Sequence, residues 1–468
     1  MTTFQDLQAA QNENKLEEFI IKTISEHDTT QYAENRAYYD SKNPYLANLK
    51  IRVELADSAP IDLTPKNKIY SSFAEIIIDH IVSRLWDNPV KLDSDTIKTS
   101  LGEYFNEDVH EYARHAAIDG VSWVFYNNGA PQMFTASEFI PLADERNGDV
   151  LSGIRYWQIA DDKPQTVQLY EMDGVTEWQE KDGKLIPVDE RGEVVSVAMK
   201  RAYRINRPIG GSAYTLTTPE TPGENYNAFP VVPYYINPKR KSELTESVKS
   251  KINFYDEKST MYNDEVVEEK GFMWSVRGYG GKPKDLAEMM EIARKLRIIA
   301  DRKLDDNADI NVATTEAPYL SHRESLERTE AEIYRDARIM NPNVLMSGGV
   351  TTVAIRAAMM REDKKMVGVE TEARRFIRRL LAVAGKTSNT ISFVHKTLVN
   401  ELEITQRLIQ WIQSGVPVED LIPLDPLFAE IAKELQSAIE AKGIGMSDED
   451  LEMLERFKSM NKDEQSSG

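Results

Sequence analysis

Apolar residues recur every three to four positions along much of the chain, and this period is typical of an amphipathic helix. The pattern covers residues 5–25 and then 67–82. The second helix is expected to stop by Asn88-Pro89, because a residue before proline avoids helical backbone angles. A third run covers about 107–118 and ends at Asp119-Gly120. The first part of the chain is therefore predicted to be helical.

Beyond Gly120 the apolar period changes to two, which indicates β-strands. Asp173-Gly174 and Asp182-Gly183 predict hairpin turns, whose two central residues need positive φ. An exposed loop is expected at the Gly- and Pro-rich stretch 208–222. Segments rich in aromatic and β-branched residues predict strands at 123–126, 154–159, 167–170 and 175–178. These features predict an antiparallel β layer that follows the helices.

A pair of helices with an insertion between them is predicted next. The first helix begins at Ser242, an N-cap residue, and ends at Gly271. The second opens with a capping box at 321–324 and ends before Asn341-Pro342. The intervening chain predicts two strands and one helix, at 272–276, 310–313 and 284–303. We therefore expect a small α/β insertion at the tip of a helical hairpin.

The longest predicted helix covers residues 352–384, roughly 45 to 50 Å at 1.5 Å per residue. Its apolar residues cluster on one side, and six cations form a basic face on the other: Arg361, Lys364, Lys365, Arg375, Arg378 and Arg379. This face is suited either to nucleic acid or to the acidic surface of a neighbouring subunit, and the pattern does not favour one over the other. A strand at 390–394 and helices at 401–413, 427–441 and from Ser447 are predicted beyond it, before a polar tail at 461–468.

Composition narrows the class of protein. A chain of 468 residues suggests about three domains. Hydrophobic residues make up 41%, which is enough to form folded cores. The absence of cysteine excludes disulfides, thiolate catalysis and cysteine zinc sites. Neither a signal peptide nor an apolar run of membrane-spanning length is found, so we expect a soluble protein of a reducing cytoplasm.

The charge argues against tight binding of nucleic acid. Asp and Glu number 77 against 57 Lys and Arg, which leaves a formal net charge of -20. A protein that holds DNA firmly neutralises phosphates with Lys and Arg, and on average this chain repels them. The acid excess also keeps a surface well solvated.

No catalytic or metal-binding motif is predicted. His110 and His115 are five residues apart, about 500° around a helix, and so do not share one face for zinc. The glycine-rich stretch 278–283 lacks the spacing of a phosphate-binding loop. Acidic clusters at 305–309 and 448–450 are interpreted as solvated charge rather than Mg²⁺ ligands. We expect no catalytic residue, no metal site and no cofactor.

The order and spacing of several segments carry a family resemblance. These segments are 67–90, 117–123 continued by 154–157, 230–234, 346–356, and 399–401 with 415–421. Together they resemble the portal proteins of tailed bacteriophages, the head-to-tail connectors of long-tailed phages of Gram-positive hosts. The likeness covers about residues 32–442.

The resemblance implies an α+β, predominantly helical fold. It comprises a wing of helices with an antiparallel β layer, a helical-hairpin stem, a small α/β clip, a long wing helix and a helical crown. The implied ranges are 1–236 for the wing, 237–270 and 319–342 for the stem helices, 271–318 for the clip, 343–351 for a tunnel loop, 352–385 for the long helix, 386–425 for the connection, 426–460 for the crown and 461–468 for a disordered tail.

The resemblance also implies function: a dodecameric ring at the capsid vertex of the virion, assembled in the host cytoplasm with capsid and scaffolding proteins. The ring is a passive channel for double-stranded DNA, and terminase and head-completion or adaptor proteins dock on it. The implied DNA-proximal residues of the tunnel loop are Asn343, Val344, Leu345, Met346, Ser347, Gly348 and Gly349. The implied clip docking surface comprises Trp274, Arg277, Tyr279, Lys284 and Arg294.

Two other classes of protein compete with this interpretation. Scattered carboxylates can assemble a cytoplasmic Mg²⁺-dependent hydrolase or nuclease, whose activity would vanish on chelation. A non-enzymatic capsid scaffold or adaptor would assemble without forming a channel.

Overall fold

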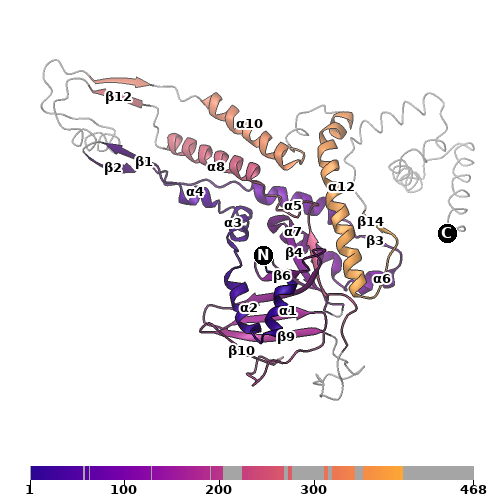
Figure 1. Ribbon diagram of the computed structural model, residues 1–468. Helices are drawn as coiled ribbons and strands as arrows, with labels where there is room; N and C mark the ends of the chain where they lie inside the picture. The colour runs from indigo at the N-terminus through magenta and orange to yellow at the C-terminus, as the bar shows by residue number, and fades with distance from the viewer. Residues whose placement is uncertain are drawn as a thin grey trace, which may run out of the picture. The chain divides into compact units, whose positions relative to one another are not determined.

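A computed structural model describes the chain at residues 2–55, 58–62, 64–127, 129–189, 191–203, 224–267, 272–276, 310–314, 319–342 and 352–393 (Figure 1). The contacts divide the chain into two units, and almost all described residues belong to the first, residues 1–348 with 356–396. The predicted loop at 208–222, the helix at 284–303 and every element predicted beyond residue 393 lie outside the described residues.

The amino-terminal segment forms short helices instead of the single helix predicted for 5–25. The chain breaks at Asn14, which adopts a positive φ of 57°. A capping box between Thr3 and Asp6 starts the first helix. The four helices are α1 (Phe4–Asn12), α2 (Leu16–Ser25), α3 (Thr30–Tyr39) and α4 (Pro44–Asn48).

Three further helices precede the sheets: α5 (Phe73–Trp86), α6 (Asp95–Ser100) and α7 (Phe105–Asp119). The predicted start of α5 at residue 67 is wrong. The Ile69 amide donates to the Thr260 hydroxyl at 2.9 Å and the Ser71 amide to the Asp256 carboxylate at 3.0 Å. Because these two backbone amides donate to side chains of another helix, α8, the segment before Phe73 is not helical. The predicted end of α7 is confirmed, because Gly120 caps it with a φ of 90°.

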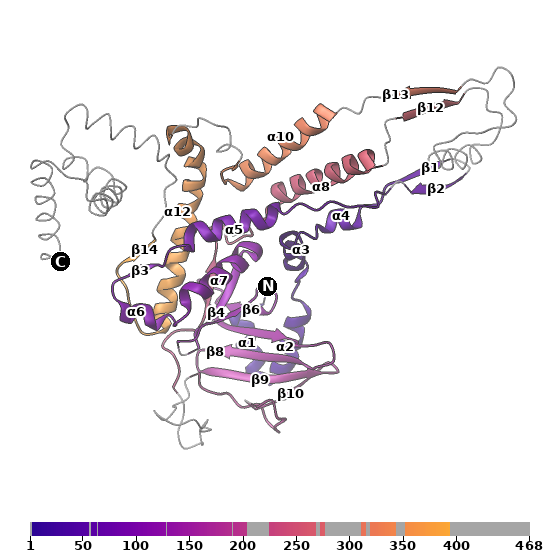
Figure 2. The same cartoon turned by 180° about the vertical axis from the view of Figure 1, so that it is seen from behind.

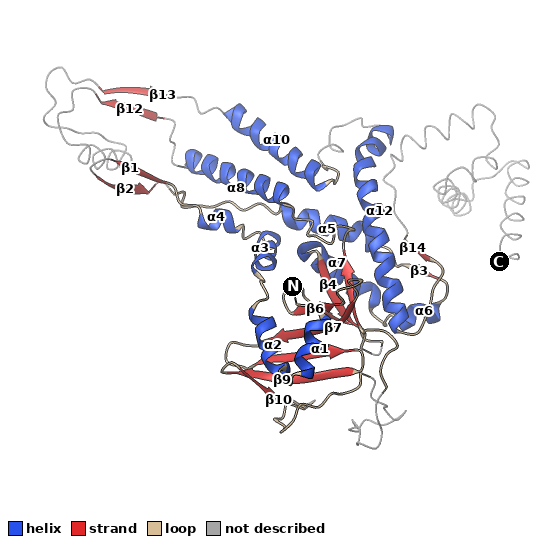
Figure 3. Cartoon of the chain, viewed as in Figure 1, coloured by secondary structure: helices blue, strands red, loops and turns tan. Residues whose placement is uncertain are grey.

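The antiparallel β layer is confirmed and consists of two sheets (Figure 3). The larger has the order β10-β9-β8-β7-β6 and the smaller the order β11-β4-β5. Their strands are β4 (Val121–Phe125), β5 (Gln132–Phe134), β6 (Phe139–Ala143), β7 (Val150–Trp157), β8 (Gln165–Glu171), β9 (Gly174–Lys181), β10 (Lys184–Pro187) and β11 (Val231–Tyr235).

The two predicted hairpin turns differ from each other. Asp182 and Gly183 join β9 to β10 with φ values of 53° and 76°, as a tight turn with two left-handed residues requires. Between β8 and β9 the turn residues are Met172 and Asp173, and Gly174 is already the first strand residue. Gly174 needs its missing side chain, because a Cβ there would lie 2.4 Å from the Arg201 carbonyl oxygen.

The predicted helical hairpin is present as α8 (Glu246–Val267) and α10 (Tyr319–Ala337). The strands β12 (Phe272–Val276) and β13 (Ile310–Thr314) pair antiparallel between them, as expected. Both predicted starts are wrong. The Glu243 amide donates to the Ala117 carbonyl, which delays α8 beyond Ser242, and Ser321 lies inside α10 instead of capping it.

The predicted long helix is confirmed as α12 (Thr352–Val383). The predicted strand at 390–394 is shorter, β14 (Ile391–Ser392), and pairs with β3 (Lys91–Leu92). A separate hairpin is formed by β1 (Arg52–Leu55) and β2 (Ser58–Asp62).

Two apolar cores hold these elements. The larger joins α5, α7, β4, β11, α8, α10 and α12 around fully buried side chains such as Phe376 and Tyr234. The smaller lies where α1 and α2 cover the five-stranded sheet and is centred on Trp178. The first core therefore fixes the helical hairpin and α12 on a common base.

Candidate functional site

The helices α8 and α10 lie side by side, as both views of the chain show (Figure 2). Buried Val248 and Ile252 of α8 and Ile333 of α10 belong to one core. At one end the Lys251 ammonium lies 2.6 Å from the Asp336 carboxylate, which also accepts from the Ser247 hydroxyl. The two helices thus form a pair bound by apolar packing and one charged network.

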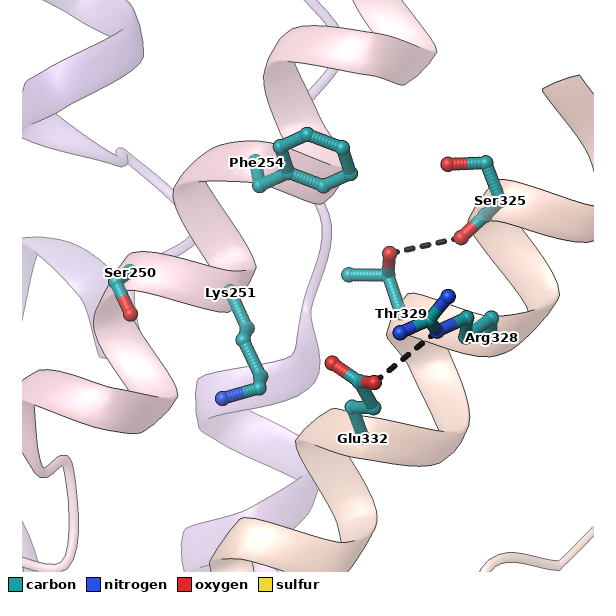
Figure 4. Close-up of a pocket in the computed structure, with 7 residues that line it drawn as sticks. All are labelled: Ser250, Lys251, Phe254, Ser325, Arg328, Thr329 and Glu332. Atoms are coloured by element: carbon teal, nitrogen blue, oxygen red, sulfur yellow. Dashed lines mark hydrogen bonds and ion pairs between the residues drawn. The ribbon is translucent and has the colours of Figure 1, made fainter.

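Beside this network lies a pocket of about 280 Å³ between the two helices. Phe254, whose surface is 42% exposed, borders it (Figure 4). The charged side chains that line the pocket already have partners. Lys251 pairs with Asp336, and Arg328 pairs with Glu332 at 3.2 Å. The lining residues are Ser250, Lys251, Phe254, Ser325, Arg328, Thr329 and Glu332. The pocket is a mixed polar and apolar groove.

Acid should weaken the α8–α10 pair through Asp336. Hydrogen bonds from Lys251 and Ser247 lower the pKa of Asp336 from its ordinary value near 3.8 to about 2. Because the folded-state pKa is the lower one, the stabilisation is complete above about pH 4 and is lost as the pH falls toward 2. The free energy of unfolding of the Asp336→Asn variant, measured in denaturant titrations, is expected to depend less steeply on pH between pH 4 and 2. Ser325→Ala, on the same helix pair, should show the same dependence of the free energy of unfolding on pH as wild type. If Asp336→Asn also showed the wild-type dependence, Asp336 would not be the group that makes this pair sensitive to acid.

A buried carboxylate on α12 joins three elements. Glu362 is 1% exposed, and its carboxylate lies 3.0 Å from His80 Nε2 and 2.8 Å from Arg84 Nε, both on α5. It also accepts from the Met340 amide at 2.9 Å, just after α10. Burial acts to raise the pKa of Glu362, but His80, Met340 and Arg84 outweigh it and keep the pKa below its usual value. Glu362 therefore ties the chain that leaves α10 to α5 and α12.

The predicted basic face of α12 is only partly exposed. Arg361, Lys364, Arg375, Arg378 and Arg379 are exposed. The sixth residue, Lys365, was expected on the surface, and this expectation is wrong. Its side chain is 9% exposed, its ammonium lies 2.6 Å from Glu243, and it donates to the Ala337 carbonyl at 2.7 Å.

The other predicted site residues are placed only in part. Trp274 lies in β12, opposite Val312 of β13. Outside the described residues lie the tunnel-loop segment 343–349 and the clip residues Arg277, Tyr279, Lys284 and Arg294.

Glu362 and its partners were missed from the sequence, although one signal was present. The apolar side of α12 runs through Met359, Met366 and Val369, and Glu362 interrupts it at the same helical spacing. A carboxylate within an apolar stripe requires buried partners. Its partners were not identifiable, because His80 is 282 residues away in the chain.

Two further kinds of feature, a metal centre and a membrane-spanning helix, are absent from the described part of the chain. No group of three or more His, Asp or Glu side chains there is arranged to hold a metal ion. None of the helices described combines the length and apolar character needed to cross a membrane.

Comparisons with known proteins identify the family. The model of the family described as phage portal protein, SPP1 Gp6-like, matches residues 18–410. The portal protein of Bacillus phage SPP1 is 23% identical over 92% of this chain and 88% of its own length. The portal protein of Clostridium phage phiCD119 is 21% identical over 74% of this chain and 76% of its own.

Solved structures give a weaker likeness. Chains from the neck of an empty gene transfer agent particle and from the native virion of such a particle cover 74% and 73% of this chain. Sequence identity is 9% for both, with TM-scores of 0.38 and 0.37.

The family-model match over residues 18–410 defines the class of this chain as the phage portal proteins. The chain belongs to the SPP1 Gp6-like family of these proteins. The resemblance inferred from the sequence is thereby confirmed, including the hosts, since Bacillus and Clostridium are Gram-positive. The family is generally structural, and its members form the ring at the capsid vertex through which DNA passes and on which other proteins dock.

Proposed function

We propose that the segments of this chain form the parts of a portal subunit, with the ranges expected from the sequence. In this proposal α8 and α10 are the stem helices, 271–318 is the clip, 343–351 is the tunnel loop and α12 is the long wing helix. The remaining ranges are 1–236 for the wing, 386–425 for its connection to the crown and 426–460 for the crown. The antiparallel pair of strands β12 and β13, which lies between α8 and α10 in the sequence, supports this division.

The family match over 18–410 is the observation that carries the functional proposal. The ring is dodecameric and conducts double-stranded DNA without an active site of its own, while terminase supplies the work. Terminase and later a head-completion protein dock on the clip, on a surface that includes Trp274 and Lys284. Assembly takes place in the host cytoplasm with capsid and scaffolding proteins.

The net charge of -20 supports a conduit that does not grip DNA. Each fixed phosphate contact adds a salt-dependent binding energy that would slow sliding. An acidic wall keeps such contacts few, so the duplex can move through the ring.

Electron microscopy of the purified full-length protein tests the proposal. Rings pierced by a channel wide enough for a DNA duplex are expected. Monomers, closed dimers or an assembly without a channel would contradict it. Nuclease or phosphatase activity that disappears on chelation of Mg²⁺ would contradict the passive role.

Substitution of Leu345 and Met346 by serine is expected to lower DNA content several-fold in particles assembled with the variant. The segment 343–350 carries no charge, and its large apolar side chains suit contact with a duplex by shape. The measurement is the packaged DNA per purified capsid. Val197→Ser, at a 69% exposed position next to the five-stranded sheet, is the control and should package normally. If particles with the Leu345 and Met346 variant contained as much DNA as wild type, the proposed role of this segment in packaging would be wrong.

A further inference from the structure

The exposed side of α12 carries cations that have no partner within the subunit. Among the described residues, no ion pair or hydrogen bond engages the side chains of Arg361, Lys364, Arg378 or Arg379. Met360 and Val367 lie on the same helix and are 55% and 63% exposed. This α12 stripe therefore combines free positive charge with exposed apolar surface.

Such a mixture is characteristic of a protein interface. Surfaces that hold DNA are strongly polar and positively charged. Protein interfaces bury apolar side chains together with arginine. Two cations of the basic face are moreover neutralised within the subunit, because Arg375 lies 2.5 Å from Glu372 and Lys365 pairs with Glu243. The composition of the α12 stripe thus favours a protein partner with acidic groups over a DNA backbone.

A complementary stripe, called the α7 stripe, covers the exposed side of α7 and the two residues before it, Glu103 and Tyr104. Glu103, Glu107 and Glu111 are exposed at intervals of four residues, beside Tyr104, which is 64% exposed. Glu111 lies 3.9 Å from His115, but burial lowers the pKa of His115 to about 4, so this imidazole is neutral near pH 7. Arg114 also interacts electrostatically with Glu111. Glu107 favours the start of its helix through the dipole. The α7 stripe therefore offers negative charge beside an exposed aromatic ring, and no ion pair of Glu103 or Glu107 is recorded among the described residues.

Charged residues recur within one helical turn on both stripes. Glu107 and Glu111 are separated by four residues, about 6 Å along the helix. Arg361 and Lys364 of the α12 stripe are separated by three residues, about 4.5 Å, and Arg378 and Arg379 are adjacent. No ion pair recorded among the described residues joins the cations of the α12 stripe to the acids of the α7 stripe inside one subunit.

We propose that the α12 stripe of one subunit binds the α7 stripe of a second copy of this chain. The inference rests on the proposed ring, in which each copy presents both surfaces and the contact repeats head to tail until the ring closes. Opposite charges steer the copies together and select the correct register, while Met360, Val367 and Tyr104 supply apolar contact.

Charge reversal with rescue tests this interface. One full-length variant carries Arg378→Glu with Arg379→Glu, a second carries Glu107→Arg with Glu111→Arg, and a third combines all four changes. Ring formation is measured by sedimentation and negative-stain microscopy, after circular dichroism and thermal unfolding have shown that each variant is folded. We expect each double variant to need at least a tenfold higher protein concentration than wild type to form rings. The combined variant is expected to form rings at concentrations close to those of wild type. Lys184→Glu with Arg191→Glu, which changes the same charge at exposed positions near β10, should assemble like wild type.

The remaining outcomes separate the two proposals. Rings at wild-type concentrations in both double variants would overturn the interface and leave the portal function intact. Loss of assembly without recovery in the combined variant would overturn the pairing of these two stripes. Intact rings that bind duplex DNA less tightly only in the Arg378 and Arg379 variant would assign the α12 stripe to DNA. A wild-type protein that forms no ring would overturn the proposed function itself.

Discussion

Replacing Phe376 with alanine is expected to lower the free energy of unfolding by about 3 to 5 kcal/mol. Phe376 is fully buried, and its ring stacks on Tyr234 of β11 with centroids 4.6 Å apart. Tyr234 in turn accepts a hydrogen bond from the Trp86 indole of α5 at 3.0 Å. The truncation removes the ring that attaches α12 to the smaller sheet and leaves a cavity among side chains already fixed in place.

Equilibrium unfolding in denaturant measures this effect. Phe376→Leu should cost clearly less than the alanine variant, because it retains most of the apolar volume. Lys386→Ala, at an exposed position beyond the end of α12, should stay within about 0.5 kcal/mol of wild type. A Phe376→Ala variant as stable as Lys386→Ala would show that α12 does not depend on this contact.

Replacing Glu362 with glutamine is expected to destabilise the protein by about 3 kcal/mol, the lower end of the range for breaking a buried ion pair. The change keeps the volume but removes the negative charge that faces His80 and Arg84. The lower end applies because these partners are partly solvated, with side chains 38% and 17% exposed. The same denaturant titration provides the measurement.

Asp363 supplies the matched control for Glu362. It also pairs with Arg84, at 2.6 Å, but its side chain is 57% exposed. An exposed pair contributes about 1 kcal/mol or less, so Asp363→Asn should change the stability little. Equal effects of Glu362→Gln and Asp363→Asn would mean that burial of Glu362 does not determine its contribution.

Both residues act on the same part of the proposed portal mechanism. Phe376 holds α12 against β11, and Glu362 holds Met340, which precedes the proposed tunnel loop, against α12. Lys365 adds a second contact, to the carbonyl of the last residue of α10. The chain at the end of α10 and the helix α12, which flank the proposed loop in the sequence, are therefore joined by these contacts.

Much of the fold could be predicted because its signals are local. The apolar period of α12, the change of period after Gly120 and the two-residue turn at Asp182-Gly183 each depend on residues close together in the sequence. The start of α5 could not be predicted in this way. Ile69 and Ser71 continue a helical pattern, but their amides bind Thr260 and Asp256, almost two hundred residues further along the chain.

The candidate site divides along the same line. The basic face of α12 follows from periodicity, and five of its six cations are indeed exposed. Which cations remain free depends on partners from other elements: Glu243 takes up Lys365, whereas Arg378 and Arg379 face no acid of their own subunit among the described residues. No strand was predicted at β11, which contains Pro233, a residue without an amide donor. Its pairing with β4 places Tyr234 against Phe376.

Local sequence was thus sufficient for the presence of five helices, α5, α7, α8, α10 and α12, and for four of the eight strands of the β layer. Through the order of its segments it also indicated membership of the portal family. It left open how buried charge is compensated and which exposed charge is free to bind another molecule. The physical reason is that a period depends on backbone geometry within a few residues, whereas an ion pair such as Glu362 with Arg84 forms only when folding brings distant segments within about 3 Å.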